Sequence, residues 1–440
     1  MPSEARSYPE RVEMVPLTKP LAGVASVPGS KSITNRALVL GALFDCTDFD
    51  IHNALLSEDT ELMMKALEKL GWQTFSSQET AFVSLYRHDW HLFHSDSFLP
   101  PEANLFVGNS GTTMRFLCAL VSLGSGTYRL DGTLRMRQRP IEDLLSALRQ
   151  LGVDAQSENG NGCPPAVIRS QGLRGGKVRI KGNVSSQFLS GLLMAAPFAD
   201  SEITIEVDGP LVSVPYVRMT VKMMRGFGLN VETENWTQFR CSKAKRPSPN
   251  SDYLVEPDVS AASYFWAAAA ITGGTITVAD LTRDSIQGDI RFVDLLEQMG
   301  CRVESCSSGI TVHGRPLHGI DVDMNDISDT VMTLAAVACF AEGPTTIRNV
   351  AHIRHKETDR ISALATELRK IGAEVEEYAD GLKITPRPLH GAEIETYNDH
   401  RMAMSMALVG LKVPGIVILN PGCVAKTYPG FWEDLEKLRC

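Results

Sequence analysis

The sequence predicts an α/β protein made of a pair of three-unit domains, and two recurring patterns support this. A helix end of the form Leu-x-x-apolar-Gly, with Met in place of Leu once, precedes a short strand five times. A second helix, rich in Ala, Leu and Met, alternates with the first. Each period therefore contains two helices between strands, and periods of this length favour α/β units over a solenoid. The helix-ending glycines, 72 to 81 residues apart, are Gly71, Gly152, Gly228, Gly300 and Gly372.

Composition excludes several classes of protein. The 440 residues are 43% hydrophobic and 22% charged, which is typical of a globular chain long enough for two or three domains. A net charge of −9 and the lack of a basic run argue against nucleic acid as a partner. No apolar stretch is long enough to span a membrane, and the nine cysteines lack metal-site spacing. We therefore expect a cytoplasmic protein with reduced thiols.

The elements follow one another in a regular order along the chain. A possible strand at residues 11–17 comes first, and we assign it to the second half of the chain. β-Branched strands are predicted at 275–278, 345–347 and 416–418. The small-residue helices are predicted to begin near Ala37, Phe116, Phe188, Ser263, Val331 and Met402.

The polar segment 242–252 marks the predicted junction between the domains. Three units then lie on either side of it. We expect a first domain at residues 30–255 and a second made of 1–29 with 256–440. The chain would cross between them near residues 29 and 255, and these two crossings would form a hinge.

A polar loop precedes each small-residue helix. The first, Pro-Gly-Ser-Lys-Ser-Ile-Thr-Asn-Arg at 28–36, combines a turn signal with N-cap candidates, and it places Lys31 and Arg36 at a helix start. Helix starts favour anions, so cations there indicate a bound anion, although solvated cations beside an ordinary cap are the simpler alternative for one loop. Equivalent loops in two facing domains would form one anion site. The loops lie at 29–36, 108–115, 182–187, 256–261, 325–329 and 397–401.

Further cations stand before the other helices. Pro140 is well placed for a first helical position after Arg139, and Lys356 and Arg360 would share one face of a helix. Solvated helix starts would explain any one of these segments. The gathering of cations at loop-to-helix junctions of an acidic protein indicates an anionic ligand instead. The gathered cations are Lys31, Arg36, Arg115, Arg139, Lys356, Arg360, Arg401 and Lys426.

Two carboxylates stand among these cations. Asp329 leads into the apolar run 331–340, and Glu357 lies between Lys356 and Arg360. An N-cap at Asp329 and a local ion pair at Glu357 are the plain interpretations. A general base and a proton carrier in a cationic cleft are the functional ones. No metal pattern, Walker loop, nucleophile elbow or dinucleotide fingerprint is found in the sequence.

Seven motifs, in order, resemble those of the 3-phosphoshikimate 1-carboxyvinyltransferase family. The resemblance implies two domains, each of three βαβαββ-type units with helices inside (the inside-out α/β barrel of enolpyruvyl transferases), and an active site in the interdomain cleft. It implies transfer of the enolpyruvyl group of phosphoenolpyruvate to the 5-hydroxyl of shikimate 3-phosphate, in chorismate and aromatic amino acid biosynthesis, without metal or organic cofactor. The motifs lie at 28–36, 108–115, 139–140, 184–188, 356–360, 399–401 and 425–427.

The resemblance also implies roles for individual residues. Asp329 matches the base that takes the 5-hydroxyl proton, Glu357 and Lys426 are candidates for the other proton transfers, and His400 lies beside them. Lys31 is implied at both substrates and in catalysis. For shikimate 3-phosphate the implied contacts are Ser32, Arg36, Ser185, Ser186, Gln187, Ser213, Asp329 and Lys356. For phosphoenolpyruvate they are Gly111, Arg139, Gln187, Arg360, Arg401 and Lys426.

Three positions depart from the best-known branch of this family, and two alternatives remain open. Phe116 stands where proline is common, His352 where an asparagine often contacts the shikimate phosphate, and Ser110 is variable. The sister transferase acting on UDP-N-acetylglucosamine has Lys-Asn and a reactive cysteine, whereas here Ser32 follows Lys31 and Cys118 lies in an apolar helix. A non-catalytic sugar-phosphate-binding protein with the same fold would need the cations but not Asp329, Glu357 and Lys426 together. We expect a monomer, with no nucleic acid or membrane partner.

Overall fold

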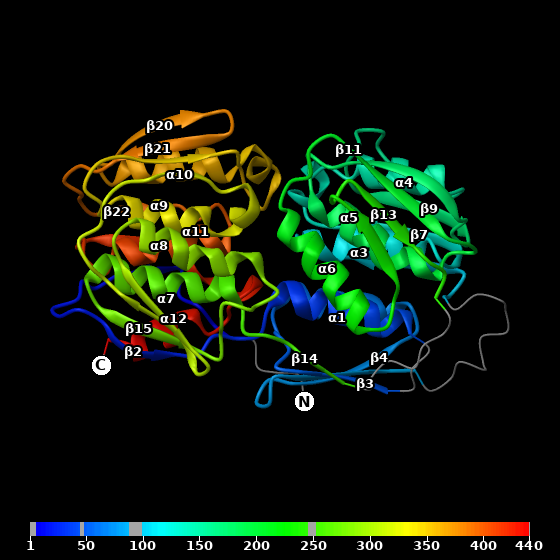
Figure 1. Ribbon diagram of the computed structural model, residues 1–440, viewed down its shortest axis with the longest axis horizontal. Helices are drawn as coiled ribbons and strands as arrows, with labels where there is room; N and C mark the ends of the chain where they lie inside the picture. Colours follow the sequence, from blue (N-terminus) through cyan, green and yellow to red (C-terminus); the bar gives the residue numbers. More distant parts are fainter. Residues whose placement is uncertain (1–5, 45–47, 88–98, 245–251, 440) are drawn as a thin grey trace. The chain divides into compact units, whose positions relative to one another are not determined.

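A computed structural model describes residues 6–44, 48–87, 99–244 and 252–439 (Figure 1). The chain forms two compact units, one of residues 29–255 and the other of residues 1–28 with 256–440. The chain therefore passes between the units twice, after Pro28 and after Val255. Most of the predicted junction, residues 245–251, lies outside the described residues.

The unit of residues 29–255 contains three four-stranded sheets. In each, the first two strands in the order are parallel and the other two pairings are antiparallel. The first sheet is β14 (Asp252–Leu254), β3 (Asp48–His52), β5 (Phe82–Tyr86) and β4 (Gln73–Ser77). The second is β6 (Glu102–Phe106), β7 (Ser125–Asp131), β9 (Ala166–Gln171) and β8 (Asp154–Ser157). The third is β10 (Gly176–Lys181), β11 (Ile203–Asp208), β13 (Gln238–Cys241) and β12 (Val231–Glu234).

Two sets of helices belong to these sheets. The inner set, α1 (Lys31–Leu43), α3 (Gly111–Val121) and α5 (Ser186–Ala195), is buried almost throughout, and its members contact one another. Their small and apolar residues on every face allow this burial. The outer set buries one face only and consists of α2 (Glu58–Lys69), α4 (Glu142–Gln150) and α6 (Val214–Gly226). The predicted βαβαββ units with helices inside are therefore confirmed.

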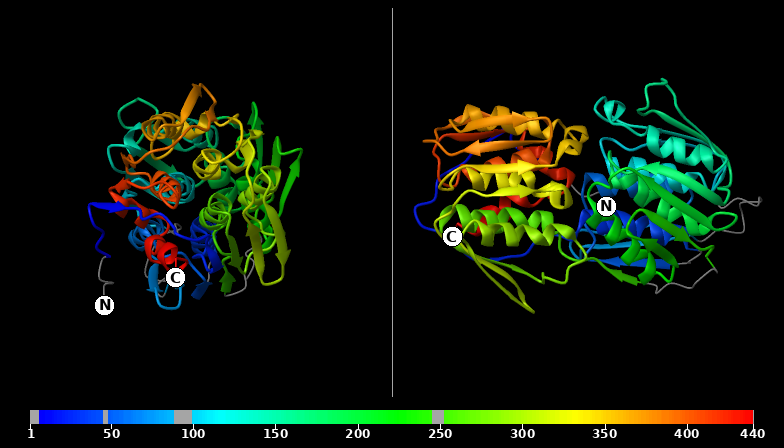
Figure 2. Two further views of the ribbon diagram at one scale, coloured as in Figure 1. Left: turned by 90° about the vertical axis from the view of Figure 1, so that its left-hand side faces the viewer. Right: turned by 45° about the horizontal axis from the view of Figure 1, so that its top comes forward.

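The second unit repeats this plan. Its inner helices are α7 (Val259–Thr272), α9 (Val331–Ala338) and α11 (His400–Val409), which run side by side (Figure 2). Its outer helices are α8 (Phe292–Gln298), α10 (Arg360–Lys370) and α12 (Phe431–Lys437). One sheet is β16 (Arg302–Cys306), β17 (Gly309–His313), β15 (Thr275–Ala279) and β2 (Ala22–Ala25). The next is β18 (Asp321–Asp323), β19 (Thr345–Arg348), β21 (Gly381–Thr385) and β20 (Glu374–Tyr378). The last is β1 (Arg11–Glu13), β23 (Ile416–Leu419) and β22 (Ala392–Ile394).

The strands next to the two crossings stay with the unit that the chain leaves. β2 pairs in parallel with β15, although the helix after it, α1, belongs to the other unit. β14 likewise pairs in parallel with β3, although α7 follows it. The strand predicted at 11–17 is shorter, because only Arg11–Glu13 pair with β23. The N-terminal segment thus completes sheets of the second unit.

The predicted helix ends agree with the structure, whereas most of the predicted starts of the inner helices do not. All five repeat glycines have left-handed backbone conformations, with φ between 78° and 112°, which only glycine adopts without steric cost. Most inner helices begin earlier than predicted, for example α1 at Lys31 rather than Ala37 and α3 at Gly111 rather than Phe116. The polar loop residues therefore form the first helical turns. None of the helices in the described part of the chain combines the length and apolarity that crossing a membrane requires.

Candidate active site

Three inner helices of the first unit begin with residues from the predicted loops. Lys31, Gly111 and Ser186 are the first residues of α1, α3 and α5. Ser185 caps α5, because its Oγ accepts a hydrogen bond from the backbone N–H of Gln187 at 3.3 Å. The remaining N–H groups of such a turn carry partial positive charge and favour an anion.

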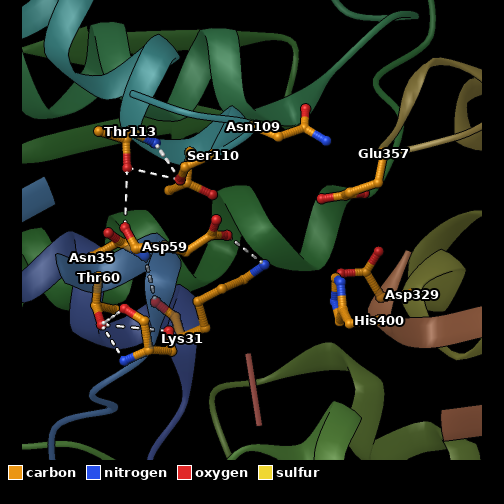
Figure 3. Close-up of polar contacts among 12 residues, drawn as sticks. Lys31, Asn35, Asp59, Thr60, Asn109, Ser110, Thr113, Asp329, Glu357 and His400 are labelled. Carbon is orange, nitrogen blue, oxygen red and sulfur yellow. Dashed lines mark hydrogen bonds and ion pairs between the residues drawn. The ribbon is translucent and has the colours of Figure 1, made fainter. Parts of the chain in front are cut away.

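Lys31 is held by a carboxylate that the sequence analysis did not identify. Its Nζ lies 3.2 Å from Oδ2 of Asp59, and the two side chains are 12% and 2% exposed (Figure 3). Asp59 stands in the first turn of α2 beside Glu58 and Glu61. An acidic first turn is ordinary at a helix start, so the local sequence gave no signal of this contact. The pair fixes an ammonium group at the start of α1.

Two arginines lie against the first turn of α3. Arg139 Nη1 donates to the backbone oxygen of Asn109 at 2.9 Å, and Arg115 Nη1 donates to Gln187 Oε1 at 3.5 Å. A methyl group on Gly111 would overlap both guanidinium groups. The backbone of Gly111 is not left-handed, so its glycine is explained by this close approach rather than by a turn. The prediction that Pro140 occupies the first helical position after Arg139 is wrong. Ile141 is the N-cap of α4, so Pro140 lies before the helix.

Arg36 is engaged inside its own unit. It is 2% exposed, its Nε donates to Thr220 Oγ1 at 2.7 Å, and its Nη1 donates to the backbone oxygen of Ser32 at 2.8 Å. Burial lowers the pKa of Arg36 to about 10, which still leaves it charged at neutral pH. Ser32 is half-buried and is therefore more exposed to solvent than Arg36. Ser213 is the N-cap residue of α6 and has a left-handed backbone (φ 53°), a strained conformation that is often found at functional positions.

The second unit gathers three cations around Asp329. Its Oδ1 lies 3.2 Å from Arg360 Nη1 and 3.6 Å from Lys356 Nζ, and its Oδ2 lies 2.8 Å from Arg401 Nη2. Asp329 belongs to the short 3-10 helix Asn325–Thr330, and Thr330 is the N-cap of α9. The N-cap interpretation of Asp329 is therefore wrong. Its carboxylate instead compensates the charge of three side chains.

Arg360 is the most enclosed of these cations. It is 1% exposed, with its Nε 2.8 Å from Asp399 Oδ2 and its Nη2 2.9 Å from Glu357 Oε2. Burial lowers the pKa of Arg360, but the nearby carboxylates outweigh burial and raise it overall. The local ion pair predicted for Glu357 is confirmed. The prediction that Lys356 and Arg360 share one face of a helix is wrong, because α10 begins at Arg360 and Lys356 lies outside it.

The start of α11 completes this cluster. Asp399 caps the helix, since its Oδ1 accepts from the backbone N–H of Arg401 at 2.9 Å. Arg401 Nη1 also donates to the hydroxyl of Tyr264 on α7 at 3.4 Å. His400 is fully buried, with its Nδ1 3.7 Å from Asp399 Oδ1. Lys426 is 5% exposed and ends the 3-10 helix Pro421–Lys426.

Cys118, on α3, is a buried thiol rather than an activated one. Burial raises the pKa of the Cys118 thiol to about 12, which makes it a poor nucleophile. Each cysteine in the described ranges is free. Within those ranges no three His, Cys, Asp or Glu side chains gather as metal ligands. What the two clusters do offer is oriented cations and carboxylates for polyanionic ligands.

Comparison with known proteins places the chain in a family. The model of EPSP synthase (3-phosphoshikimate 1-carboxyvinyltransferase) matches residues 15–435. The chain is similar to the 3-phosphoshikimate 1-carboxyvinyltransferase of Nostoc punctiforme, with 49% identity over 96% of this chain and 98% of that one. It is similar to the chloroplastic enzyme of that name from Arabidopsis thaliana, with 44% identity over 95% and 82%.

Solved structures agree with this. An EPSP synthase from Acinetobacter baumannii superposes with a TM-score of 0.79 at 26% identity, covering 97% of this chain and 98% of that one. The enolpyruvyl transferase NikO from Streptomyces tendae has a TM-score of 0.76, covering 98% and 97%. At 19% identity, NikO supports the fold alone.

Proposed function

This chain belongs to the EPSP synthase (3-phosphoshikimate 1-carboxyvinyltransferase) family, and from that premise we propose how its residues divide the reaction. The chain is a transferase of the shikimate pathway. It moves the enolpyruvyl group of phosphoenolpyruvate to the 5-hydroxyl of shikimate 3-phosphate and releases phosphate. The division of roles, the closing cleft between the units and the cellular setting are our proposal.

We propose that shikimate 3-phosphate binds mainly at the first unit. Its phosphate lies at the start of α5, on Ser185 and Ser186, with Ser213 and Lys356 completing the contacts. The free N–H groups of that helix start support this, because they favour phosphate oxygens without a metal. Lys31, Ser32, Arg36 and Gln187 hold the ring and carboxylate in this assignment.

Phosphoenolpyruvate is assigned to the arginines of both units. Arg139, beside Gly111, and Arg360 with Arg401 bind its phosphate and carboxylate, and Lys31, Gln187 and Lys426 complete the site. Guanidinium groups suit both anions because they donate two parallel hydrogen bonds. The proposal places both substrates in one interdomain cleft that closes on them.

Asp329 is the proposed base for the 5-hydroxyl. The observation that carries this assignment is the convergence of Lys356, Arg360 and Arg401 on its carboxylate. Substrate phosphate and carboxylate groups compete for these same cations. When they bind, Asp329 loses counter-ions and becomes free to accept the hydroxyl proton as the oxygen attacks C2 of phosphoenolpyruvate.

The remaining proton transfers fall to groups close by. Glu357 and Lys426 are proposed to give a proton to the methylene carbon, take one back, and protonate the departing phosphate. His400 lies beside Asp399 and is assigned to the same set. Addition of the 5-oxygen and the proton gives a tetrahedral intermediate, and loss of phosphate and a methyl proton restores the double bond.

Phosphate release from purified protein tests the function. With phosphoenolpyruvate and shikimate 3-phosphate together we expect stoichiometric phosphate and the enolpyruvyl product, and none with either alone. Turnover with UDP-N-acetylglucosamine would identify the sister transferase instead. Tight binding without turnover would identify a binding protein.

We also propose a cytoplasmic monomer. Free cysteines in the described residues and bacterial relatives support a cytoplasmic setting. Sedimentation at equilibrium checks the oligomeric state, and a mass near 48.1 kDa is expected.

A further inference from the structure

The segment that leads into α11 is strained. Residues 395–399 connect β22 to α11 and present Asp399 and Arg401 to the cluster around Asp329. Tyr397 and Asn398 both have φ of 53°, in the left-handed region, and neither is glycine. Asparagine adopts this region more readily than other residues, but for tyrosine it is unfavourable, so the conformation of Tyr397 persists only where its surroundings hold it.

A local turn and a buried carboxylate hold it. The backbone N–H of Asp399 donates to the backbone oxygen of Thr396 at 2.8 Å, which closes a turn over the two left-handed residues. Glu367 on α10 is fully buried, and its Oε2 accepts the backbone N–H of Glu395 at 3.1 Å. Its Oε1 accepts the hydroxyl of Tyr397 at 2.8 Å. Lys370, three residues further along α10, lies 2.6 Å from Oε2 and compensates the charge. Burial and the hydrogen bond to Glu367 raise the pKa of Tyr397 to about 12, so its hydroxyl remains a donor at working pH.

Helix α10 therefore holds this segment at two points. Arg360 at the start of α10 binds Asp399, and Glu367 lies seven residues later, about two helical turns and on the same face. Arg360 holds the end of the segment at Asp399, and Glu367 holds its beginning at Glu395. Between them lie the two strained residues, so the direction in which α11 starts is set by both contacts.

A further hydrogen bond reaches the segment of Lys426. Asn420 Nδ2 donates to Asn398 Oδ1 at 3.2 Å. Asn420 is itself left-handed (φ 48°) and directly precedes the 3-10 helix that ends at Lys426. The strained segment thus connects Glu367 with two side chains assigned to phosphoenolpyruvate, Arg401 and Lys426.

We propose that Glu367 is a positioning residue for the phosphoenolpyruvate side of the site. It touches no substrate and acts by fixing Tyr397 and the segment that aims Arg401, Asp399 and, through Asn420, Lys426. The inference rests on the proposed roles of Arg401 and Lys426. Without the two Glu367 hydrogen bonds the turn keeps its own backbone bond and the Arg360–Asp399 pair but loses its connection to the middle of α10. The turn can then shift as a whole, and displacements of about 1 Å are enough to weaken catalytic geometry severely.

Two variants remove the contacts to different extents. Tyr397→Phe deletes only the hydroxyl, and Glu367→Met deletes both acceptors at similar length. Glu367→Gln is the conservative variant, since its amide oxygen can keep the Glu395 bond and its amide nitrogen can donate to Tyr397. The matched control is Tyr378→Phe in the same unit, where the Tyr378 hydroxyl bonds Glu376 Oε2 at 2.9 Å on the exposed strand β20.

Steady-state kinetics with each substrate varied in turn separates positioning from support of the fold. We expect KM for phosphoenolpyruvate to rise about threefold in Tyr397→Phe and about tenfold or more in Glu367→Met. The tenfold change corresponds to about 1.4 kcal/mol. KM for shikimate 3-phosphate should stay within about twofold, Glu367→Gln should restore most of the loss, and Tyr378→Phe should match the wild type.

The opposite results overturn the inference. Unchanged KM for phosphoenolpyruvate in Tyr397→Phe, with only a lower melting temperature or a lower active fraction, means that Glu367 merely supports the fold. Equal rises in both KM values would also overturn it. If Glu367→Met does not fold, Tyr397→Phe and Glu367→Gln still decide. A wild-type protein that releases no phosphate would refute the proposed function, which is a separate result from an active wild type with unaffected variants.

Discussion

The carboxylate of Asp329 and the guanidinium of Arg401 form an ion pair 2.8 Å long between the starts of two neighbouring inner helices, α9 and α11. Arg360 and Lys356 approach the other oxygen of the same carboxylate. The group proposed as base is thus also the internal counter-ion of the residues proposed to bind substrate. In the proposed mechanism ligand binding would free the base, because the substrate anions and the Asp329 carboxylate would compete for the same cations.

Replacement of Asp329 tests that coupling. Asp329→Asn should lower kcat by roughly 10²–10⁴-fold, the usual effect of removing a general base. Binding of shikimate 3-phosphate should persist, and KM for phosphoenolpyruvate should fall or stay unchanged, since a competing anion is gone. Stopped-flow phosphate release and calorimetric titration measure both. Asp326→Asn is the control, because Asp326 lies in the same 3-10 helix but pairs with exposed Arg291. Near-normal turnover of Asp329→Asn would rule out the assignment.

His352 predicts a specific pH dependence of stability. It is buried beside Lys356, and burial with that charge lowers the pKa of His352 to about 3. The unfolded chain therefore binds a proton near pH 6.5 that the folded chain refuses until about pH 3. The stability that His352 contributes is full above pH 6.5 and is lost as pH falls below it.

His352→Asn should accordingly flatten the acid side of the stability curve. Between pH 6.5 and 5 the wild type should lose up to about 1.4 kcal/mol per pH unit more than the variant. Urea unfolding at several pH values gives the comparison. His355→Asn, in the same 3-10 segment but exposed, should follow the wild type. Parallel curves for wild type and His352→Asn would show that His352 is not held neutral in the fold.

The repeat pattern predicted the architecture well because each unit carries its own local signals. The glycine at each helix end, such as Gly300, needs only a left-handed backbone, and that requirement is visible in a few residues. The small-residue helices are apolar all round, which already implies burial inside the units. Starts of helices were less well predicted, because polar residues such as those around Lys31 fit a loop and a first turn equally.

Contacts between distant segments could not be predicted in this way. In the sequence Asp59 is typical of an acidic helix start, and only the fold brings Lys31 against it. Tyr264 is likewise typical of a core residue, and only the fold shows that Arg401 donates to its hydroxyl. Glu367 sits on a regular amphipathic helix, and nothing near it in sequence indicates that it holds Tyr397. The pairing of β2 with β15 and of β14 with β3 likewise joins segments that are far apart in the sequence.

The two crossings lead to a prediction about closure. We propose that they form a hinge and that shikimate 3-phosphate favours a closed state, since bound anions screen cations that otherwise repel. Small-angle scattering should show a smaller radius of gyration at saturating ligand. Shikimate without its 3-phosphate is the control and should have a smaller effect. An identical scattering curve at saturation would contradict closure.

Gly111 predicts a separation between two ligands. A methyl group there would overlap the guanidinium ends of Arg115 and Arg139, which are flexible and can yield, so Gly111→Ala should fold. The helical backbone at Gly111 accepts alanine, and the melting temperature should stay near that of the wild type. Shikimate 3-phosphate should still bind. The displaced Arg139 should raise KM for phosphoenolpyruvate by a factor of about 10 or less.

Glyphosate should be affected more strongly than phosphoenolpyruvate. The family resemblance implies that this inhibitor would occupy the phosphoenolpyruvate pocket, where, as the longer ligand, it would meet the new methyl group first. KM for phosphoenolpyruvate and Ki for glyphosate, measured in both proteins beside thermal melts, decide the matter. Gly226→Ala is the control, because Gly226 ends α6 with open space around it and its substitution should change neither constant. Unchanged constants in Gly111→Ala would show that Gly111 does not line the pocket. Loss of folding would mean that the packing of the Arg115 and Arg139 guanidinium groups at Gly111 is needed for the unit itself.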